Sequence, residues 1–332
     1  MVYIYKKAIG EKTYYYLRAS ERKGNRILVK DIAYLGTSLE DVKKTLNTLP
    51  LYAEQIRKAY KTIHHFLESN HYLEKVRDSK LKHDPFLENK LFEMEACKLH
   101  YTAVFNHFPE LTKQEIFKNF IIEFAFNTNS IEGNTIKLPE ARNLLQEGVV
   151  PKDTSLREIH DMQNTQKVFG LLQQSTEEMS HELIIKIHAQ LMENVDPRIG
   201  YRTTDVRVIR SNFDATPAPY VKTDMGLLLG WYDKNKQNLH PVVLAAIFHH
   251  KFEKIHPFLD GNGRTGRMIF NYILMKHNYP PTIIHAKNRK DYLKAMRIAD
   301  SSKPLEATKE QYQPLIEFVA QEMSNTYWSI FL

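Results

Sequence analysis

The first 36 residues alternate apolar and polar positions, most clearly in KTYYYLRAS and RILVKDIAYLG, with a turn at ERKGN between them. A period of two, rich in Tyr, Ile, Val and Leu, is typical of strands that expose one face. The pattern therefore predicts a small antiparallel β unit of one or two hairpins over residues 1–36. After Gly36 apolar residues recur every three or four positions, which predicts helices over most of the remaining chain.

The helical part contains one strong interruption, KHDPF at 82–86. Pro85 disfavours helical backbone in the residue before it, so we expect a boundary there. TSLE (37–40) and TKQE (112–115) match the capping box, and Thr37 and Thr112 are expected to begin helices. Gly133 is expected to end the second of these helices. Further helices are expected at 138–147, 155–175, 180–194, 222–236, 241–255, 262–277, 289–299 and 308–324.

One stretch inside the helical part has a different pattern. Residues 201–221, YRTTDVRVIRSNFDATPAPYV, have alternating β-branched residues followed by two prolines, which predicts a short β-hairpin. The chain is thus expected to be mainly α. It would consist of a β unit (1–36), a helical linker region (37–108) and a helical domain (109–325) that contains this hairpin.

Charge and composition restrict the partners. The 332 residues carry a net charge of +7, which makes an anionic partner plausible, whether nucleotide, nucleic acid or acidic protein. Aromatic residues alternate with surplus Lys and Arg in the β unit, so nucleic-acid binding stays open beside a half-buried hairpin with a solvated face. The single cysteine excludes an intrachain disulfide. The chain begins without an apolar signal-peptide core and has no membrane-spanning stretch, so we expect a cytoplasmic protein without membrane contact.

Residues 256–267, HPFLDGNGRTGR, lie between two apolar helical patterns. The motif is therefore a loop that leads into a helix N-terminus, which is a binding site for anions. Gly261 and Gly263 allow backbone N–H groups to approach a ligand closely. Arg264 and Arg267 are three residues apart on the new helix, so both are expected near the same anion.

The same motif carries a metal ligand and a base. Asp260 is the kind of oxygen ligand that Mg²⁺ takes together with phosphate oxygens. His256 titrates near neutral pH and can accept a proton from an attacking hydroxyl. Together these features predict phosphoryl or nucleotidyl transfer. A Walker A loop is excluded because no GKS or GKT follows the glycines, and the spacing of His249, His250 and His256 does not match a zinc-binding helix.

The motif resembles the signature of the Fic family, H-x-F-x-D/E-G-N-G-R-x-x-R, at every specified position, and the resemblance covers about residues 110–325. It implies a mainly helical Fic core with a β-hairpin flap at about 201–221 and a catalytic loop and helix at 256–277. Members of the family transfer AMP from ATP, with Mg²⁺, to a Ser, Thr or Tyr hydroxyl of a target protein. The enzyme itself is included among the targets, and a homodimer is left open. The motif alone does not exclude phosphocholine transfer.

The resemblance also implies the roles of single residues. His256 would deprotonate the target hydroxyl, Asp260 would hold Mg²⁺ between the α- and β-phosphates, and Phe258 would pack beneath the loop. The residues that would hold the phosphates are Gly261, Asn262, Gly263, Arg264 for the β-phosphate and Arg267 for the γ-phosphate.

Outside the motif, the flap would pair with extended backbone of the target through Arg207, Val208, Ile209 and Arg210. Tyr292 would lie near the adenine, and Asp300 stands where close relatives are expected to have Asn.

A second motif, TNSIEG (128–133), places Thr128 and Glu132 four residues apart on one helix face. Taken alone it is an exposed helix end. Beside the Fic signature it resembles the family's inhibitory motif, S/T-x-x-x-E-G/N, on an inhibitory helix at about 112–133. In that motif the Glu pairs with the second arginine, here Arg267, so the γ-phosphate would lose its cation and the α-phosphate its in-line geometry. The resemblance thus implies an autoinhibited AMP-transferase. AMP removal by the same site, and a nucleic-acid-binding regulator with the Fic core as nucleotide sensor, are the alternatives.

Overall fold

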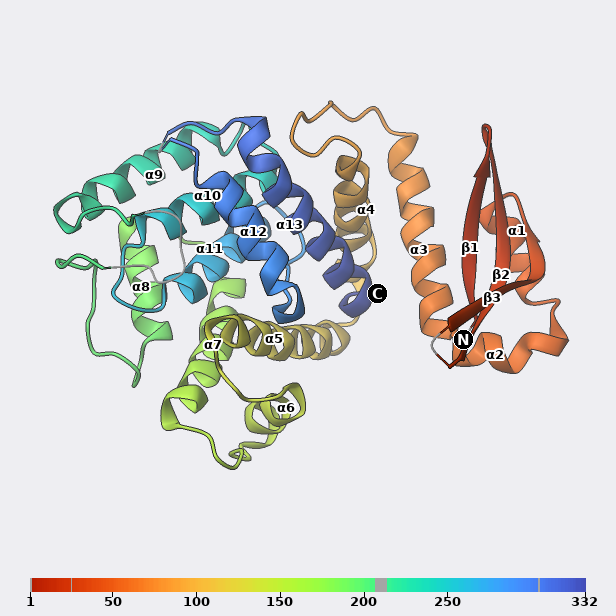
Figure 1. The fold of residues 1–332 in the computed structure, drawn as a ribbon, viewed down its shortest axis with the longest axis horizontal. Helices are drawn as coiled ribbons and strands as arrows, with labels where there is room; N and C mark the ends of the chain where they lie inside the picture. The colour runs from red at the N-terminus through yellow and green to blue at the C-terminus, as the bar shows by residue number, and fades with distance from the viewer. Residues whose placement is uncertain (1, 25, 207–213, 304) are drawn as a thin grey trace. The chain divides into compact units, whose positions relative to one another are not determined.

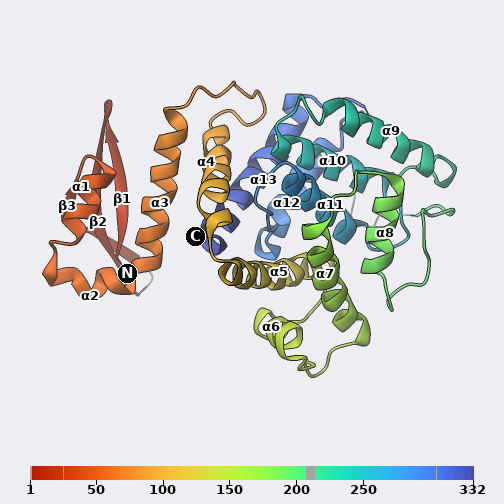
Figure 2. The same ribbon diagram turned by 180° about the vertical axis from the view of Figure 1, so that it is seen from behind.

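The computed structural model describes residues 2–24, 26–206, 214–303 and 305–332. Within these ranges the chain has thirteen α-helices and one three-stranded antiparallel sheet (Figures 1 and 2). The expected mainly α fold with a small N-terminal β unit is confirmed. The chain divides into two compact units, Met1–Leu81 together with Leu332, and Lys82–Phe331. No helix of the described ranges combines the length and the apolar character that crossing a bilayer requires.

The first unit is a sheet covered on one face by helices. Two hairpins join its strands in the order β1 (Val2–Ile9), β2 (Lys12–Lys23) and β3 (Arg26–Gly36). Alternate residues such as Ile4 and Leu17 form a buried inner face. Against this face pack Val42 and Ile63, which come from α1 (Leu39–Leu46) and α3 (Tyr60–Arg77), and the short α2 (Ala53–Lys58) lies between these two helices in the chain.

Both expected capping boxes need correction. Helix α1 is capped by Ser38, one residue after Thr37: the Ser38 hydroxyl accepts from Asp41 N at 3.1 Å, and the Asp41 carboxylate accepts from Ser38 N at 3.2 Å. Helix α5 (Glu110–Glu132) begins before Thr112, after the extended backbone of Pro109 and without a side-chain cap. The prediction that Gly133 ends this helix is confirmed, because Gly133 adopts left-handed backbone with φ +104°.

The second unit is built around two helices that are apolar on nearly all sides. Residues 242–252 of α10 are all buried, as is most of α11, which predicts a position inside the unit. Figure 1 shows α10 and α11 surrounded by the other helices. The helices of this unit are α4 (Lys90–Ala103), α5, α6 (Leu138–Glu147), α7 (Leu156–Gln174), α8 (His181–Leu191), α9 (Val221–Asn235), α10 (Pro241–Ile255), α11 (Asn262–Lys276), α12 (Arg289–Ala299) and α13 (Lys309–Ile330).

Seven of the 21 residues of the expected hairpin at 201–221, residues 207–213, fall outside the described residues. The other fourteen form loops, the 3₁₀ helix Ala218–Tyr220 and the first residue of α9, without a strand. The proposed target-docking residues, Arg207, Val208, Ile209 and Arg210, fall outside the described residues. The flanking residues 201–206 and 214–217 are in loops. The start of the segment is attached to the HPFLDGNGRTGR motif, since Arg202 N donates to the carbonyl of Pro257 at 2.9 Å.

Candidate active site

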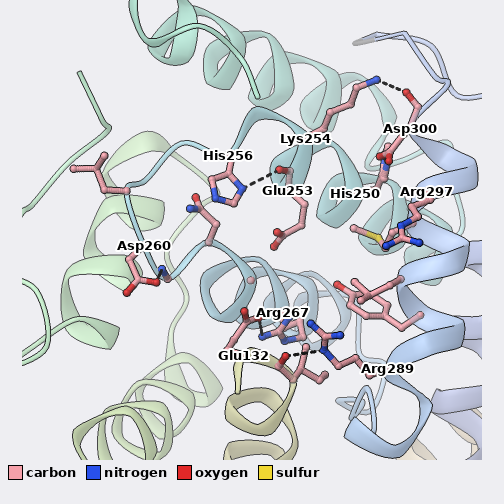
Figure 3. A pocket seen from close by; sticks show the side chains of 18 residues that line it. Glu132, His250, Glu253, Lys254, His256, Asp260, Arg267, Arg289, Arg297 and Asp300 are labelled. Atoms are coloured by element: carbon pink, nitrogen blue, oxygen red, sulfur yellow. Dashed lines mark hydrogen bonds and ion pairs between the residues drawn. The ribbon is translucent and has the colours of Figure 1, made fainter. Parts of the chain in front are cut away.

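The HPFLDGNGRTGR motif joins α10 to α11 and lines a cavity of about 340 Å³ (Figure 3). His256 caps the C-terminus of α10 in left-handed backbone (φ +53°, ψ +60°), which turns the chain away from the helix. Gly261 caps the N-terminus of α11 with φ +76°, a conformation that favours glycine. Gly261, Asn262 and Gly263 all line the cavity. The N-terminus of α11, with its unpaired first N–H groups and positive dipole end, therefore faces the cavity.

Two buried side chains hold the loop in this shape. The Asn262 amide closes it, accepting from Phe258 N at 2.9 Å and donating to Phe258 O at 2.8 Å. The Phe258 ring is fully buried and stacks on His188 with ring centroids 3.6 Å apart. His188 Nε2 donates to the carbonyl of Asp260 at 3.0 Å. Phe258 thus lies beneath the loop as expected, and the Asn262 side chain binds loop backbone.

His256 is arranged to accept a proton. Its Nδ1 lies 3.4 Å from the carbonyl oxygen of Glu253. A carbonyl can only accept, so Nδ1 carries the hydrogen and Nε2 presents a lone pair. Burial lowers the pKa of His256, and the nearby Arg202 lowers it further. The imidazole is consequently neutral at neutral pH, the form that a general base requires.

Arg267 is bound by the second motif, TNSIEG. It is 3 % exposed, and its Nη2 donates to Glu132 Oε1 at 2.6 Å and to the Thr128 carbonyl at 3.1 Å. Its Nε donates to Thr128 Oγ1 at 2.7 Å. Although burial lowers the pKa of Arg267, the Glu132 carboxylate raises it above its ordinary value. The fold therefore brings together two sequence motifs that are more than a hundred residues apart.

The Glu132 carboxylate lies directly over the start of α11. A Cβ atom on Gly263 would overlap Glu132 Oε1 and would come within 3.0 Å of Arg267 Nη1. The Glu132 side chain is 42 % exposed, so it reaches the cavity from the end of α5 without being locked in the core. Figure 3 shows Glu132 and Arg267 side by side at the cavity wall.

Arg264 occupies a different position from Arg267. It forms an ion pair with Asp161 of α7, and its Nη2 lies 3.5 Å from Asp260 Oδ1. Of the two arginines, only Arg267 is among the described residues that line the cavity. The expectation that both arginines contact one anion stays a prediction; in this structure Asp161 binds Arg264.

Asp260 presents an ionised carboxylate at the cavity edge. Although burial raises the pKa of Asp260, Arg264 and Arg157 keep it below its ordinary value. The carboxylate pairs with Arg157 and accepts from Gly261 N at 2.6 Å. One such carboxylate fits Mg²⁺, which takes its other oxygens from phosphate and water. The described residues hold no group of three His, Cys, Asp or Glu side chains suited to enclose a metal.

Tyr292 and Asp300 both line the cavity, and both are held by histidines. The Tyr292 hydroxyl lies 2.6 Å from His249 Nε2, and Asp300 Oδ1 lies 3.1 Å from His250 Nε2. Tyr292 and the aliphatic Leu293 both line this part of the cavity. The two buried histidines therefore orient the cavity wall.

Several cavity residues were not predicted from the sequence. Glu253 lies one helical turn before His256. The residue is half-buried, and its Oε1, which is shielded from solvent, has no hydrogen-bond partner within the described structure. Burial raises the pKa of Glu253 to about 8. Its only sequence signal is a carboxylate within the apolar stretch LAAIFHHKFEKI. Three further unpredicted lining residues, Lys254, Arg289 and Arg297, add positive charge.

Comparison with known proteins agrees with this site. Residues 178–274 match the model of the Fic/DOC family. The protein adenylyltransferase fic-1 of Caenorhabditis elegans is 28 % identical over 224 residues, 65 % of this chain and 42 % of that protein. The protein adenylyltransferase Fic of Nematostella vectensis is 30 % identical over 217 residues, 64 % of this chain and 49 % of that protein. The chain thus spans less than half the length of these relatives.

Solved structures show the same fold. A Fic family protein from Desulfovibrio desulfuricans G20 has a TM-score of 0.61 at 27 % identity, covering 74 % of each chain. The Fic-1 structure from C. elegans has a TM-score of 0.60 at 24 % identity, covering 88 % of this chain and 76 % of that one. The chain therefore contains a segment, residues 178–274, that is similar to the Fic/DOC family. It is a homologue, at about 28 % identity, of the protein adenylyltransferases.

Proposed function

We propose that this protein transfers AMP from ATP to a Ser, Thr or Tyr hydroxyl of a protein, and that Glu132 restrains the transfer. One observation carries the proposal: a single cavity combines the N-terminus of α11, the neutral imidazole of His256 and the guanidinium of Arg267. The relation to protein adenylyltransferases supports the same chemistry.

In the proposed step, His256 Nε2 takes the proton of the target hydroxyl. The hydroxyl oxygen forms a bond to the α-phosphorus of ATP, the bond from that phosphorus to the bridging oxygen breaks, and pyrophosphate leaves. The proton then passes from His256 to solvent. The lowered pKa of His256 supports this role, because a base that is already neutral needs no prior deprotonation.

The phosphates would be held by fixed positive groups. The N–H groups of Asn262 and Gly263 and the Arg267 guanidinium act where negative charge accumulates. Asp260 would hold Mg²⁺, which when bound neutralises phosphate charge.

The restraint follows from the position of Glu132. With its carboxylate 2.6 Å from Arg267 and directly over Gly263, Glu132 takes the cation that the γ-phosphate would use and adds negative charge in the same space. Nucleotide could then bind only with its phosphates displaced. A displacement of about 1 Å can lower the rate roughly a hundredfold.

The test is labelling with α-³²P-ATP and Mg²⁺, with and without cell lysate, by wild type, Glu132→Gly and Glu132→Gly/His256→Ala. We expect strong protein labelling by Glu132→Gly, about a hundredfold above wild type, and none by the double variant. A matched control is Glu147→Gly, because Glu147 also ends a helix before a left-handed glycine, Gly148, but is exposed and lies outside the cavity.

The outcomes separate the two parts of the proposal. Equal labelling by wild type and Glu132→Gly refutes the restraint. No label from α-³²P-ATP in any lane refutes transfer. Label from γ-³²P-ATP instead would indicate kinase chemistry. Release of label from a premodified protein, without transfer, would assign AMP removal to the site.

A further inference from the structure

The positive charge of the chain is concentrated in its first 36 residues. This segment holds eight Lys and Arg against three Asp and Glu, a net +5 out of +7 for all 332 residues. It also holds six of the eighteen tyrosines. Such an enrichment of cations and aromatic rings in a small sheet requires an explanation that the AMP-transfer site does not provide.

The strand register places most of these tyrosines on the face of the sheet opposite the helices. Tyr5 pairs with Tyr16, and Tyr16 pairs with Tyr34, so one row of tyrosines crosses all three strands. The Tyr16 and Tyr34 ring centroids are 5.5 Å apart, and Tyr34 is 52 % exposed. The hydrophobic cluster with α1 and α3 uses the alternate residues, such as Ile4 and Leu17.

Cations flank this row on the same face. Lys7 pairs with Tyr14 on one side of the row, and Arg22 continues the alternation of β2 beyond Arg18 on the other. Both Lys7 and Arg22 are exposed. Lys6 points to the inner face instead, where its Nζ lies 5.9 Å from the buried Tyr15 ring. We call the tyrosine row together with Tyr14, Lys7 and Arg22 the outer sheet face.

One contact within the face shows how its rings bind a planar cation. The Arg18 guanidinium lies 3.2 Å from the centroid of the Tyr5 ring and also pairs with Asp31, the acidic residue of this face. Because Asp31 pairs with Arg18, it does not neutralise the positive charges of Lys7 and Arg22. The outer sheet face is therefore aromatic and positively charged, although its Tyr16 and Tyr34 rings are tilted by 55° to each other.

We propose that the outer sheet face binds single-stranded nucleic acid. Unpaired bases expose their flat faces and stack on aromatic side chains, while the backbone phosphates are attracted by neighbouring cations. A duplex hides the faces of its bases, so a row of tyrosine rings offers it little. The spacing of strands, about 4.8 Å, places successive rings of the row at intervals suited to neighbouring bases.

The test measures fluorescence anisotropy of labelled 20-nucleotide DNA and RNA strands of mixed sequence, and of the DNA duplex, with the full chain at 50–300 mM NaCl. We expect single strands to bind more tightly than the duplex. Tyr16→Ser/Tyr34→Ser should weaken binding roughly 5- to 100-fold with an unchanged salt dependence, because no charge is lost. Lys7→Ala/Arg22→Ala should reduce the slope of log K against log[salt] by about 1.4.

The controls remove the same chemical groups elsewhere in the unit. Tyr60→Ser deletes an exposed tyrosine of α3, and Lys44→Ala an exposed lysine of α1. Both should bind as wild type does. Tyr34→Ser alone is the second tyrosine variant. Tyr34 is exposed on an edge strand, so its replacement is the one least expected to unfold the sheet. Circular dichroism checks that both variants are folded.

Four results would overturn the proposal. The proposal is refuted if the single-stranded oligonucleotides do not bind at 50 mM NaCl. It is also refuted if the tyrosine variants bind them as tightly as wild type does. Tighter binding of the duplex would assign the face to double-stranded DNA. Binding to phosphatidylserine vesicles that the tyrosine variant loses, without any binding of oligonucleotides, would assign it to a membrane surface. The DNA and RNA strands distinguish the two single-stranded ligands.

Discussion

The buried carboxyl of Glu253 makes the stability of the second unit depend on pH. An ordinary glutamate has a pKa of 4.5, and burial raises the pKa of Glu253 to about 8. Arg267 nearby lowers this pKa and Glu132 raises it. The substitution Glu253→Gln keeps the shape of the side chain and removes its proton equilibrium.

The sign follows from which state binds the proton. Between pH 4.5 and about 8 the folded protein keeps the Glu253 proton, while the unfolded chain has released it. The free energy of unfolding therefore falls as pH rises through this window, by up to about 1.4 kcal/mol per pH unit. From pH 5.5 to 7.5 the wild type should lose about 3 kcal/mol relative to Glu253→Gln.

Tryptophan fluorescence during urea unfolding is a suitable assay. The chain has two tryptophans, and Trp231 and Trp328 both lie in the second unit, so the signal reports that unit alone. With a urea dependence of about 3 kcal/mol per molar, the gap between the two midpoints should widen by about 1 M across this pH range. Parallel midpoints from pH 5.5 to 7.5 would refute the reasoning. Glu147→Gln, which removes an exposed carboxyl of the same unit, should show such parallel behaviour.

Three further predictions concern the loop and the base. Phe258→Ala should lower the free energy of unfolding of the second unit by about 4 kcal/mol, because it empties the space of a fully buried ring. A decrease of less than about 1 kcal/mol, measured by urea unfolding, would contradict this. Asp161→Ala should destabilise by about 3 kcal/mol, because Arg264 loses its ion-pair partner while buried; an unchanged urea midpoint would show that Arg264 finds another partner. In Glu132→Gly, the rate of AMP transfer should fall with a midpoint below pH 6.5, because the pKa of His256 is lowered from that value. A midpoint at or above 6.5 in the pH–rate profile would exclude the proposed base.

Local sequence signals predicted the bounds of several helices well and the residues that cap them poorly. The bounds of α6, α10 and α12 agree with the expected ranges 138–147, 241–255 and 289–299, because apolar spacing, prolines and glycines act within a few residues. Both capping-box predictions missed the helix start, because Ser38 caps α1 in place of Thr37 and α5 begins after Pro109 without a side-chain cap. The tight turn after Lys23 and the end of α5 at Gly133 were correctly expected from glycine.

The site shows the same division between local and long-range information. Arg264 and Arg267 look equivalent in the sequence, yet Asp161 of α7 binds the first and Glu132 of α5 the second. Only the inhibitory motif, known from the family resemblance, pointed to one of these partners. Glu253 could not be predicted, because its raised pKa depends on how completely α10 is buried. Such pairings depend on tertiary packing, which no single segment of the sequence encodes.

The pairing of Glu132 with Arg267 within one chain has a consequence for how activity could be controlled. Both partners are tethered together, so dilution of the protein does not separate them and their local concentration stays constant. Only a ligand or partner that binds the separated form more tightly can change the balance. To convert a population that is 99 % paired into one that is 99 % separated, this ligand or partner must bind the separated form about 10⁴-fold more tightly than the paired form. A partner with similar affinity for the two forms would therefore change the activity only gradually. A switch would require a partner that makes many more contacts with the separated form than with the paired form.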